Sequence, residues 1–176
     1  MTDPPDSIDE EGLFALALTL PAETPPSGLR ERILASLDPT SRFDAFVDEI
    51  ARMIDLGKDA VRGLLAKIDD AAEWVAGPGP SRLIHLPYGP SLGEVDVGFV
   101  RVPAGETFPP HRHLGDERVL VLQGGYTDTD GATVRRGETA FKPAESSHAF
   151  TASEGPDLVF LVILKEGVDI EGYGRV

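Results

Sequence analysis

Cysteine is absent from this chain of 176 residues. Disulfides, thiolate metal sites and thiol redox switches are therefore excluded, and any metal ion must be bound by histidine and carboxylate side chains. Histidine is scarce too. The chain has only four imidazole side chains, which belong to His85, His111, His113 and His148. A metal site must therefore be sought among very few residues.

Long hydrophobic runs are missing as well. The longest early apolar run, from Leu13 to Leu20, is far shorter than the roughly 20 residues that a membrane-spanning helix needs. The first residues are acidic and include no lysine or arginine, which is the wrong charge for a secretory signal. We therefore expect a cytoplasmic protein that does not bind a membrane.

Basic residues are outnumbered by acidic ones, 16 against 30, so the formal net charge is −14. Proteins that bind nucleic acid draw most of their affinity from lysine and arginine near the phosphates, so we expect no nucleic-acid partner. The segment from Ile50 to Ile68 has a spacing that resembles a helix-turn-helix, but its surroundings are also acidic. A helical pair that buries its own apolar stripe, or that of a partner, explains this segment more simply.

Helical spacing of apolar residues dominates the first part of the chain. Residues 1–11 are polar, acidic and interrupted by prolines, which predicts a disordered acidic leader. Residues 12–76 are predicted to form a small α-helical N-terminal module. Its strongest stripe consists of Phe43, Phe46, Val47, Ile50, Met53 and Ile54. Gly57 fits the position after the end of that helix, and a further helix is expected around Val61 to Ile68.

A cluster of glycine and proline at residues 77–80 marks the expected domain boundary, because the hydrophobic period beyond it becomes strand-like. The predicted strands include Leu83–Leu86, Val95–Val102, Arg118–Gln123, Thr139–Lys142 and Leu158–Leu164. Many short strands without intervening helices indicate an antiparallel sandwich or barrel. Residues 77–176 are therefore expected to form an all-β domain.

Three of the four histidines have a spacing that suits a metal site. His111 and His113 are two residues apart, so in a strand both side chains point to the same face. Glu117 follows after a short stretch that allows a bend. His148 lies on a later strand, which an antiparallel sheet can bring beside the first pair. We therefore predict that a metal ion is bound by His111, His113, Glu117 and His148. An isolated His-x-His pair would be weak evidence, and His85 is predicted to be structural.

Two sequence motifs surround these residues. In the first, Gly105 is followed after five residues by His111, then by His113, Glu117 and Gly124 at intervals of one, three and six residues. In the second, Gly137, Pro143 and His148 are separated by five and four residues. These motifs resemble those of the cupin superfamily over about residues 80–165. The resemblance implies an all-β cupin jelly-roll barrel with a metal held by the four predicted ligands.

Two positions depart from the second motif. Glu145 stands where a turn glycine is usual, and Ala152 stands where asparagine is frequent. Neither departure removes a ligand, although both bear on the local turn geometry. Three nitrogens and one oxygen suit a divalent metal ion, with zinc as our first expectation and iron, manganese or nickel as alternatives. Because ligation requires neutral imidazoles, we expect the metal affinity to fall as the pH drops toward and below about 6.5.

Helices followed by one cupin barrel resemble the cupin-bearing, ChrR-like anti-sigma factors of bacteria. The segment from Pro25 to Ala35 also looks like the helix that follows the sigma-binding bundle in such proteins. The resemblance implies a sigma factor as partner and a metal-dependent sensor as the role of the barrel. Since no histidine precedes His85 and cysteine is absent, a zinc site in the helical module is excluded. The sigma factor would then be bound through apolar helix faces, such as Leu13–Leu20 and Phe43–Ile54.

Two alternatives remain open from the sequence. The first is a small cupin metalloenzyme, a dioxygenase or an isomerase, in which His111, His113, Glu117 and His148 bind a catalytic metal. The second is a metal-stabilised homodimer that associates through sheet edges and has no separate activity. No catalytic residue beyond the metal ligands is predicted. We favour a regulator, because a catalytic barrel has no evident need for the helical module.

Overall fold

The computed structural model describes Thr19, Leu29 and residues 42–175. The predicted leader of residues 1–11 lies outside these residues, as do the apolar run Leu13–Leu20 and the segment Pro25–Ala35, apart from those two single positions. Residues Asp38–Val176 belong to one compact unit. None of the helices in the described ranges is long and apolar enough to cross a membrane.

The helices of this unit lie before the barrel in the chain. They are η2 (Asp44–Phe46), α3 (Val47–Met53), α4 (Lys58–Ala66), η3 (Lys67–Asp69) and η4 (Ala71–Glu73). The apolar stripe predicted for this segment lies on one buried face of η2 and α3. One expectation is wrong: Gly57 does not follow the end of α3 in a left-handed conformation. Asp55 takes that position with φ of 54°, and Gly57 is the extended N-cap residue of α4.

The strands form two antiparallel sheets of six strands each. The first has the order β1 (Val75–Ala76), β2 (Arg82–His85), β3 (Asp96–Val102), β10 (Leu158–Leu164), β5 (Glu117–Gln123) and β8 (Thr139–Lys142). The second has the order β12 (Gly174–Arg175), β11 (Val168–Ile170), β4 (Thr107–His113), β9 (Ser147–Ala152), β6 (Gly125–Asp128) and β7 (Thr133–Arg135). A single turn of 3₁₀ helix, η5 (Pro90–Leu92), lies between β2 and β3. The predicted all-β jelly roll preceded by helices is confirmed.

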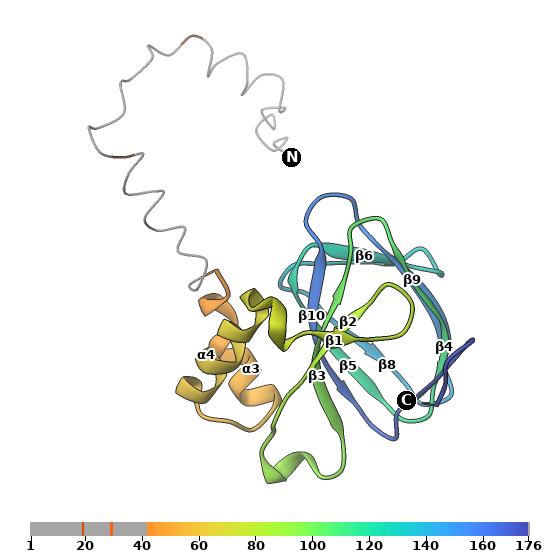
Figure 1. Cartoon of the computed structure of the whole chain (residues 1–176), viewed down its shortest axis with the longest axis horizontal. Helices are drawn as coiled ribbons and strands as arrows, with labels where there is room; N and C mark the ends of the chain where they lie inside the picture. The colour runs from red at the N-terminus through yellow and green to blue at the C-terminus, as the bar shows by residue number, and fades with distance from the viewer. Residues whose placement is uncertain (1–18, 20–28, 30–41, 176) are drawn as a thin grey trace, which may run out of the picture. The chain divides into compact units, whose positions relative to one another are not determined.

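Strand β10 contributes to a hydrophobic core on each of its two faces. Its seven residues are all apolar, which is typical of a strand buried on both faces. Phe160 faces the second sheet and belongs to the core between the two sheets. Leu161 faces the other way and belongs to a core that also contains residues of α3 and α4. The helices therefore cover the outer face of the first sheet, beside β1 and β3 in Figure 1.

The core that lies beneath the helices crosses the expected boundary at residue 77. Trp74 is buried in it together with Ile84 and Leu86 of the barrel. Across the same junction, the Arg101 guanidinium lies 4.3 Å from the centre of a Trp74 ring and donates a hydrogen bond to the Ile68 carbonyl at 2.8 Å. The segment from residue 42 to residue 74 and the barrel therefore share one hydrophobic core.

This packing corrects one expectation about a partner. The stripe from Phe43 to Ile54 was expected to bind a sigma factor through its apolar face. Its residues Phe43, Phe46, Val47, Ile50 and Ile54 are instead only 0–7% exposed, because they pack on the first sheet. They cannot contact another protein unless this core opens.

Candidate metal centre

The pairing of β4 with β9 brings three histidines together. His111 and His113 point to the same face of β4, and His148 is the cross-strand neighbour of His111 on β9. The three ring centroids are 4.5–5.1 Å apart. One nitrogen from each ring lies within 4.8 Å of the others, which is a distance that a single metal ion can bridge. Two of the rings are deeply buried, with His113 0% and His111 6% exposed.

A β-bulge in β4 orients His111. The register with β9 shifts between Phe108 and His111, where Pro109 and Pro110 lack the N–H group that a regular ladder would need. The Pro109 carbonyl lies 2.9 Å from His111 Nδ1. Since a carbonyl can only accept, Nδ1 carries the proton and Nε2 of His111 is left with its lone pair.

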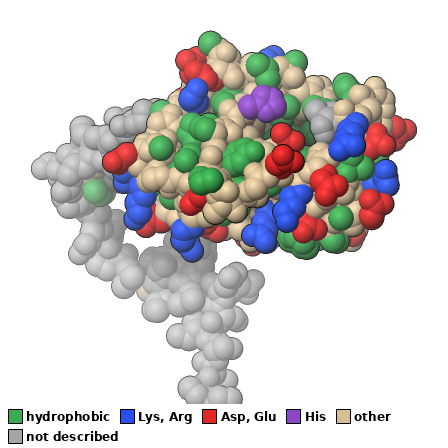
Figure 2. All heavy atoms as spheres, turned by 90° about the horizontal axis from the view of Figure 1, so that it is seen from below, with side chains coloured by type: hydrophobic (Ala, Val, Ile, Leu, Met, Phe, Trp, Pro, Cys, Tyr) green, Lys and Arg blue, Asp and Glu red, His purple; other side chains and the backbone are tan. Residues whose placement is uncertain are grey.

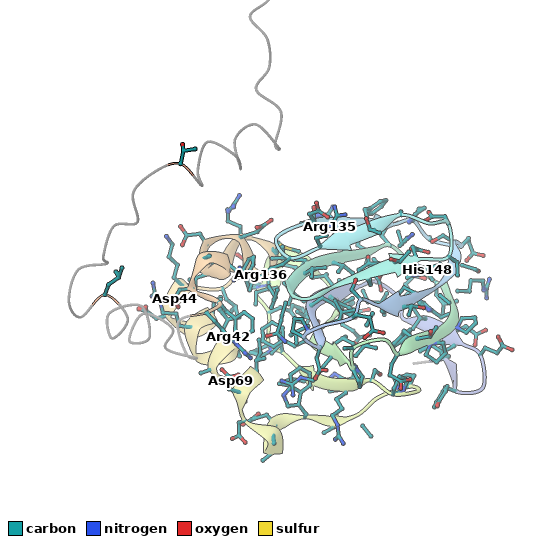
Figure 3. The ribbon with its side chains drawn as sticks, turned by 90° about the horizontal axis from the view of Figure 1, so that it is seen from above. Arg42, Asp44, Asp69, Arg135, Arg136 and His148 are labelled. Carbon is teal, nitrogen blue, oxygen red and sulfur yellow. The ribbon has the colours of Figure 1, made fainter. Side chains whose placement is uncertain are left out.

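A carboxylate orients His148 in the same way. Asp128 Oδ2, at the end of β6, accepts a hydrogen bond from His148 Nδ1 at 2.7 Å. The same oxygen lies 2.6 Å from Lys142 Nζ of β8. The bond leaves Nε2 of His148 as the unprotonated nitrogen. Figure 3 shows His148 on the barrel, away from the helical residues Asp44 and Asp69.

Several imidazole nitrogens of the cluster have no hydrogen-bond partner within the described part of the chain. They are Nδ1 and Nε2 of His113 and Nε2 of His148, and all are buried. A buried polar atom without a partner costs about 1–3 kcal/mol, so native proteins rarely keep one without a reason. A neutral imidazole has one lone pair, so a metal ion bound to Nε2 of His148 and to one nitrogen of His113 would remove much of that cost. The residues present therefore fit a divalent cation.

Glu117 lies at the edge of this cluster. It begins β5 in the opposite sheet, and its Oε2 is 3.9 Å from His113 Nδ1, too far for a hydrogen bond. The group of nitrogens that are mutually within 4.8 Å contains the three histidines and does not include Glu117. Burial raises the pKa of Glu117 to about 7. The fourth predicted ligand is thus near the imidazoles, and its carboxyl group is partly protonated at neutral pH.

Burial acts in the opposite direction on the histidines. It lowers the pKa of His111 and of His113 to about 4, and it also lowers the pKa of His148 despite the opposing effect of the hydrogen bond that His148 donates to Asp128. The rings are therefore neutral at pH 7, which is the form that binds metal. Proton competition at His111 and His113 therefore moves from about pH 6.5 to near pH 4, whereas Glu117, if it is a ligand, must lose a proton with a pKa of about 7.

Asp128 and Lys142 were missed by sequence reasoning. Burial alone would raise the pKa of Asp128, but hydrogen bonds from Lys142 and His148 outweigh it and lower the pKa to about 2. Asp128 is therefore a carboxylate at any physiological pH. One sequence signal was available: Asp128 is two residues after Tyr126 in a short strand, so an acidic side chain shares the inward face of an aromatic one.

A cavity of about 190 Å³ lies between the sheets beside this cluster. Its wall is mainly apolar and includes Val119, Phe150 and Phe160. His148, Glu117 and Tyr126 add polar atoms to it. His85 contributes to the wall but is not part of the histidine cluster, and its side chain is exposed.

The motif positions have clear backbone roles. Gly105, Gly124 and Gly137 all have positive φ, between 69° and 86°, which favours glycine. Glu145, which replaces the usual turn glycine, still takes a left-handed conformation with φ of 65°. Its N–H donates to the His113 carbonyl at 2.8 Å. The departure at Glu145 therefore leaves the turn beside the site intact, and Ala152 is simply buried in the core.

Comparisons with known proteins are consistent with this geometry. Residues 64–166 match the family model described as the ChrR cupin-like domain. The structure of Rhodobacter sphaeroides SigE in complex with the anti-sigma ChrR is similar, with 22% identity and a TM-score of 0.54 over 88% of this chain and 75% of that chain. An acetylacetone dioxygenase from Acinetobacter johnsonii has 17% identity and a TM-score of 0.50, over 61% and 78% of the two chains. A search of curated proteins finds no match. At these identities the structural likeness shows the fold.

Proposed function

The chain belongs to the ChrR cupin-like domain family, and from this we propose that it is a metal-binding regulator of the anti-sigma type. In this proposal the barrel binds a divalent metal ion and the chain binds a sigma factor. The SigE complex of ChrR supports the partner, since that relative of the same fold is an anti-sigma protein. A cytoplasmic location and a homodimer are further predictions from the sequence.

One observation carries the metal proposal: buried imidazole nitrogens of His113 and His148 have no hydrogen-bond partner among the described residues. The proposed ligands are His111, His113 and His148, with Glu117 as the fourth. A bound ion would act as a Lewis acid and would link β4 and β9 of one sheet to β5 of the other. Zinc remains the first expectation, with iron, manganese and nickel as alternatives.

Metal analysis of the purified protein tests this centre. We expect about one zinc ion per chain in the wild type and a large loss of bound metal in His113→Ala. His85→Ala is the matched control, because His85 is an exposed histidine outside the cluster. Equal metal content in all three proteins would contradict the assignment of the ligands.

The proposed sigma-binding residues lie before the described helices. The stripe from Phe43 to Ile54 is buried, so we propose the apolar run from Leu13 to Leu20, which lies outside the described residues apart from Thr19. Co-purification with sigma factors encoded beside this gene tests it. We expect a complex with the wild type and its loss in Leu16→Glu, while Val75→Glu, at a half-exposed barrel residue, keeps it. Absence of any complex with the wild type would contradict the proposal.

A second candidate function is a cupin metalloenzyme, and the apolar cavity beside Glu117 and His148 favours it. A small apolar substrate with an oxygen atom that can bind a metal ion would fit a cavity of about 190 Å³. Oxygen consumption by the iron-loaded protein with acetylacetone as the probe tests this function. Turnover that disappears in Glu117→Ala would support catalysis, and its absence in the wild type would favour the regulator.

A further inference from the structure

A lysine lies among the acidic and imidazole groups of the metal centre. Lys142 is on β8, directly across from Glu117 of β5, and its side chain is only 20% exposed. Its ammonium group lies 2.6 Å from Asp128, whose side chain is 3% exposed. Asp128 in turn holds His148. The positive charge of Lys142 therefore contacts Asp128, which in turn contacts the proposed ligand His148.

A cation in this position opposes a second cation. Two like charges at a partly buried site repel each other more strongly than in water, because the surrounding dielectric constant is lower. The ammonium group of Lys142 lies 2.6 Å from the carboxylate that holds the His148 ring, so its charge acts close to the imidazoles. This charge therefore disfavours a metal ion that binds to these rings.

We propose that Lys142 acts as a resident cation that weakens metal binding at His111, His113 and His148, and so sets the affinity of the site. The inference rests on the proposed metal centre and adds a specific role for a residue that is not a ligand. In the metal-free protein Lys142 balances the charge of Asp128. A bound ion supplies positive charge of its own, so the lysine is then in excess.

Asp128 has the opposite effect on the metal. It fixes the His148 ring with Nε2 as the lone-pair nitrogen, and its negative charge favours a nearby cation. The two members of one ion pair are therefore expected to change the metal affinity in opposite directions. An ion pair that only stabilised the fold would not produce opposite signs.

Zinc affinity measured by competition with a chromophoric chelator at pH 8 tests the inference on the full chain. We expect Lys142→Met to bind zinc at least about tenfold more tightly than the wild type. Lys142→Arg keeps the charge and should stay close to the wild type. Asp128→Asn should bind about 10–100-fold more weakly. The matched control is Lys58→Met, which makes the same charge change at an exposed lysine of α4 paired with Asp48.

The possible results distinguish a failure of the proposed role of Lys142 from a failure of the proposed metal centre. Equal or weaker zinc binding by Lys142→Met, with normal binding by the wild type, would overturn the role of Lys142 alone. Zinc binding by neither protein would overturn both proposals. If Lys142→Met folds poorly without metal, Lys142→Gln and the zinc-induced rise in melting temperature provide the second measurement. A larger rise than in the wild type supports the inference, and an equal or smaller rise contradicts it.

Discussion

At the scale of single residues, burial decides which groups are charged. The same dry environment lowers the pKa of His111 and His113 to about 4 and raises the pKa of Glu117 to about 7. In both cases the neutral form is favoured, because water no longer stabilises the charge. The cluster is therefore close to neutral before a metal ion arrives, except for the pair of Asp128 and Lys142.

Glu117 is expected to release a proton when zinc binds. Its pKa of about 7 means that most molecules carry the carboxyl proton at pH 6, whereas the histidines, with pKa values near 4, are already neutral. Titration calorimetry in buffers of different ionisation enthalpy should give about one more proton for the wild type than for Glu117→Gln at pH 6. The difference should shrink at pH 8. Equal proton release at pH 6 would show that Glu117 is not a ligand.

The stability of the metal-free protein is expected to decrease as the pH falls. The pKa of His113 is about 4 in the folded chain and about 6.5 in an unfolded one, so the unfolded state binds more protons between these values. The free energy of unfolding should decrease from about pH 6.5 toward about pH 4, by about 1.4 kcal/mol for each unit of pKa difference. Glu117 changes in the opposite sense, since its raised pKa reduces stability as the pH rises toward 7.

Urea unfolding at several pH values measures this dependence. His113→Gln removes one titrating ring at a fully buried position, so its slope against pH should be smaller than that of the wild type. His85→Gln, at an exposed histidine, should leave the slope unchanged. An identical slope in the wild type and in His113→Gln would contradict the lowered pKa.

At the scale of single elements, local irregularities position the site. The bulge at Pro109 and Pro110 aims His111, and the turn at Glu145 returns the chain so that β9 can place His148 beside β4. The five strands predicted by range lie within one residue of β2, β3, β5, β8 and β10. The sequence did not predict the C-terminal end of α3, where Asp55 replaced Gly57 as the left-handed residue. The reason is that aspartate also tolerates this conformation at moderate cost.

Glu145→Gly is expected to stabilise the protein by up to about 1 kcal/mol. The left-handed conformation is strained for glutamate and is relaxed for glycine, although glycine loses more backbone entropy on folding. The substitution also removes an ion pair of 2.9 Å with Arg112, but both side chains are largely exposed and contribute little. Urea unfolding measures the change. Arg112→Ala is the control for the lost ion pair, and a larger destabilisation by Glu145→Gly than by this control would contradict the prediction.

At the scale of the whole molecule, the helices and the first sheet of the barrel share one hydrophobic core. The outer face of the first sheet is apolar along β10 and is covered by α3 and α4. The described surface carries acidic and basic side chains in alternation on the face seen in Figure 2, rather than one continuous basic area.

A fragment that begins at the predicted boundary should therefore fold poorly. Residues 77–176 would leave the outer face of the first sheet in contact with water, and large exposed apolar areas favour aggregation. Residues 38–176 retain the helices and form one compact unit. We expect the longer fragment to unfold cooperatively and the shorter one to bind a hydrophobic dye or to aggregate. Equal, cooperative unfolding of both fragments would show that the barrel does not depend on the helices.

The sequence by itself determined the ranges of five strands, the jelly-roll class and the three histidines that gather at one point. These features depend on local spacing: one residue between His111 and His113, and fixed intervals between the motif glycines. Only the tertiary structure decided that the stripe from Phe43 to Ile54 faces the barrel, and that Asp128 and Lys142 join the site. The burial of the stripe and the position of Asp128 and Lys142 depend on which distant strands and helices pack together. A pattern of apolar residues along the sequence shows that a face is buried, but it does not show which element covers that face.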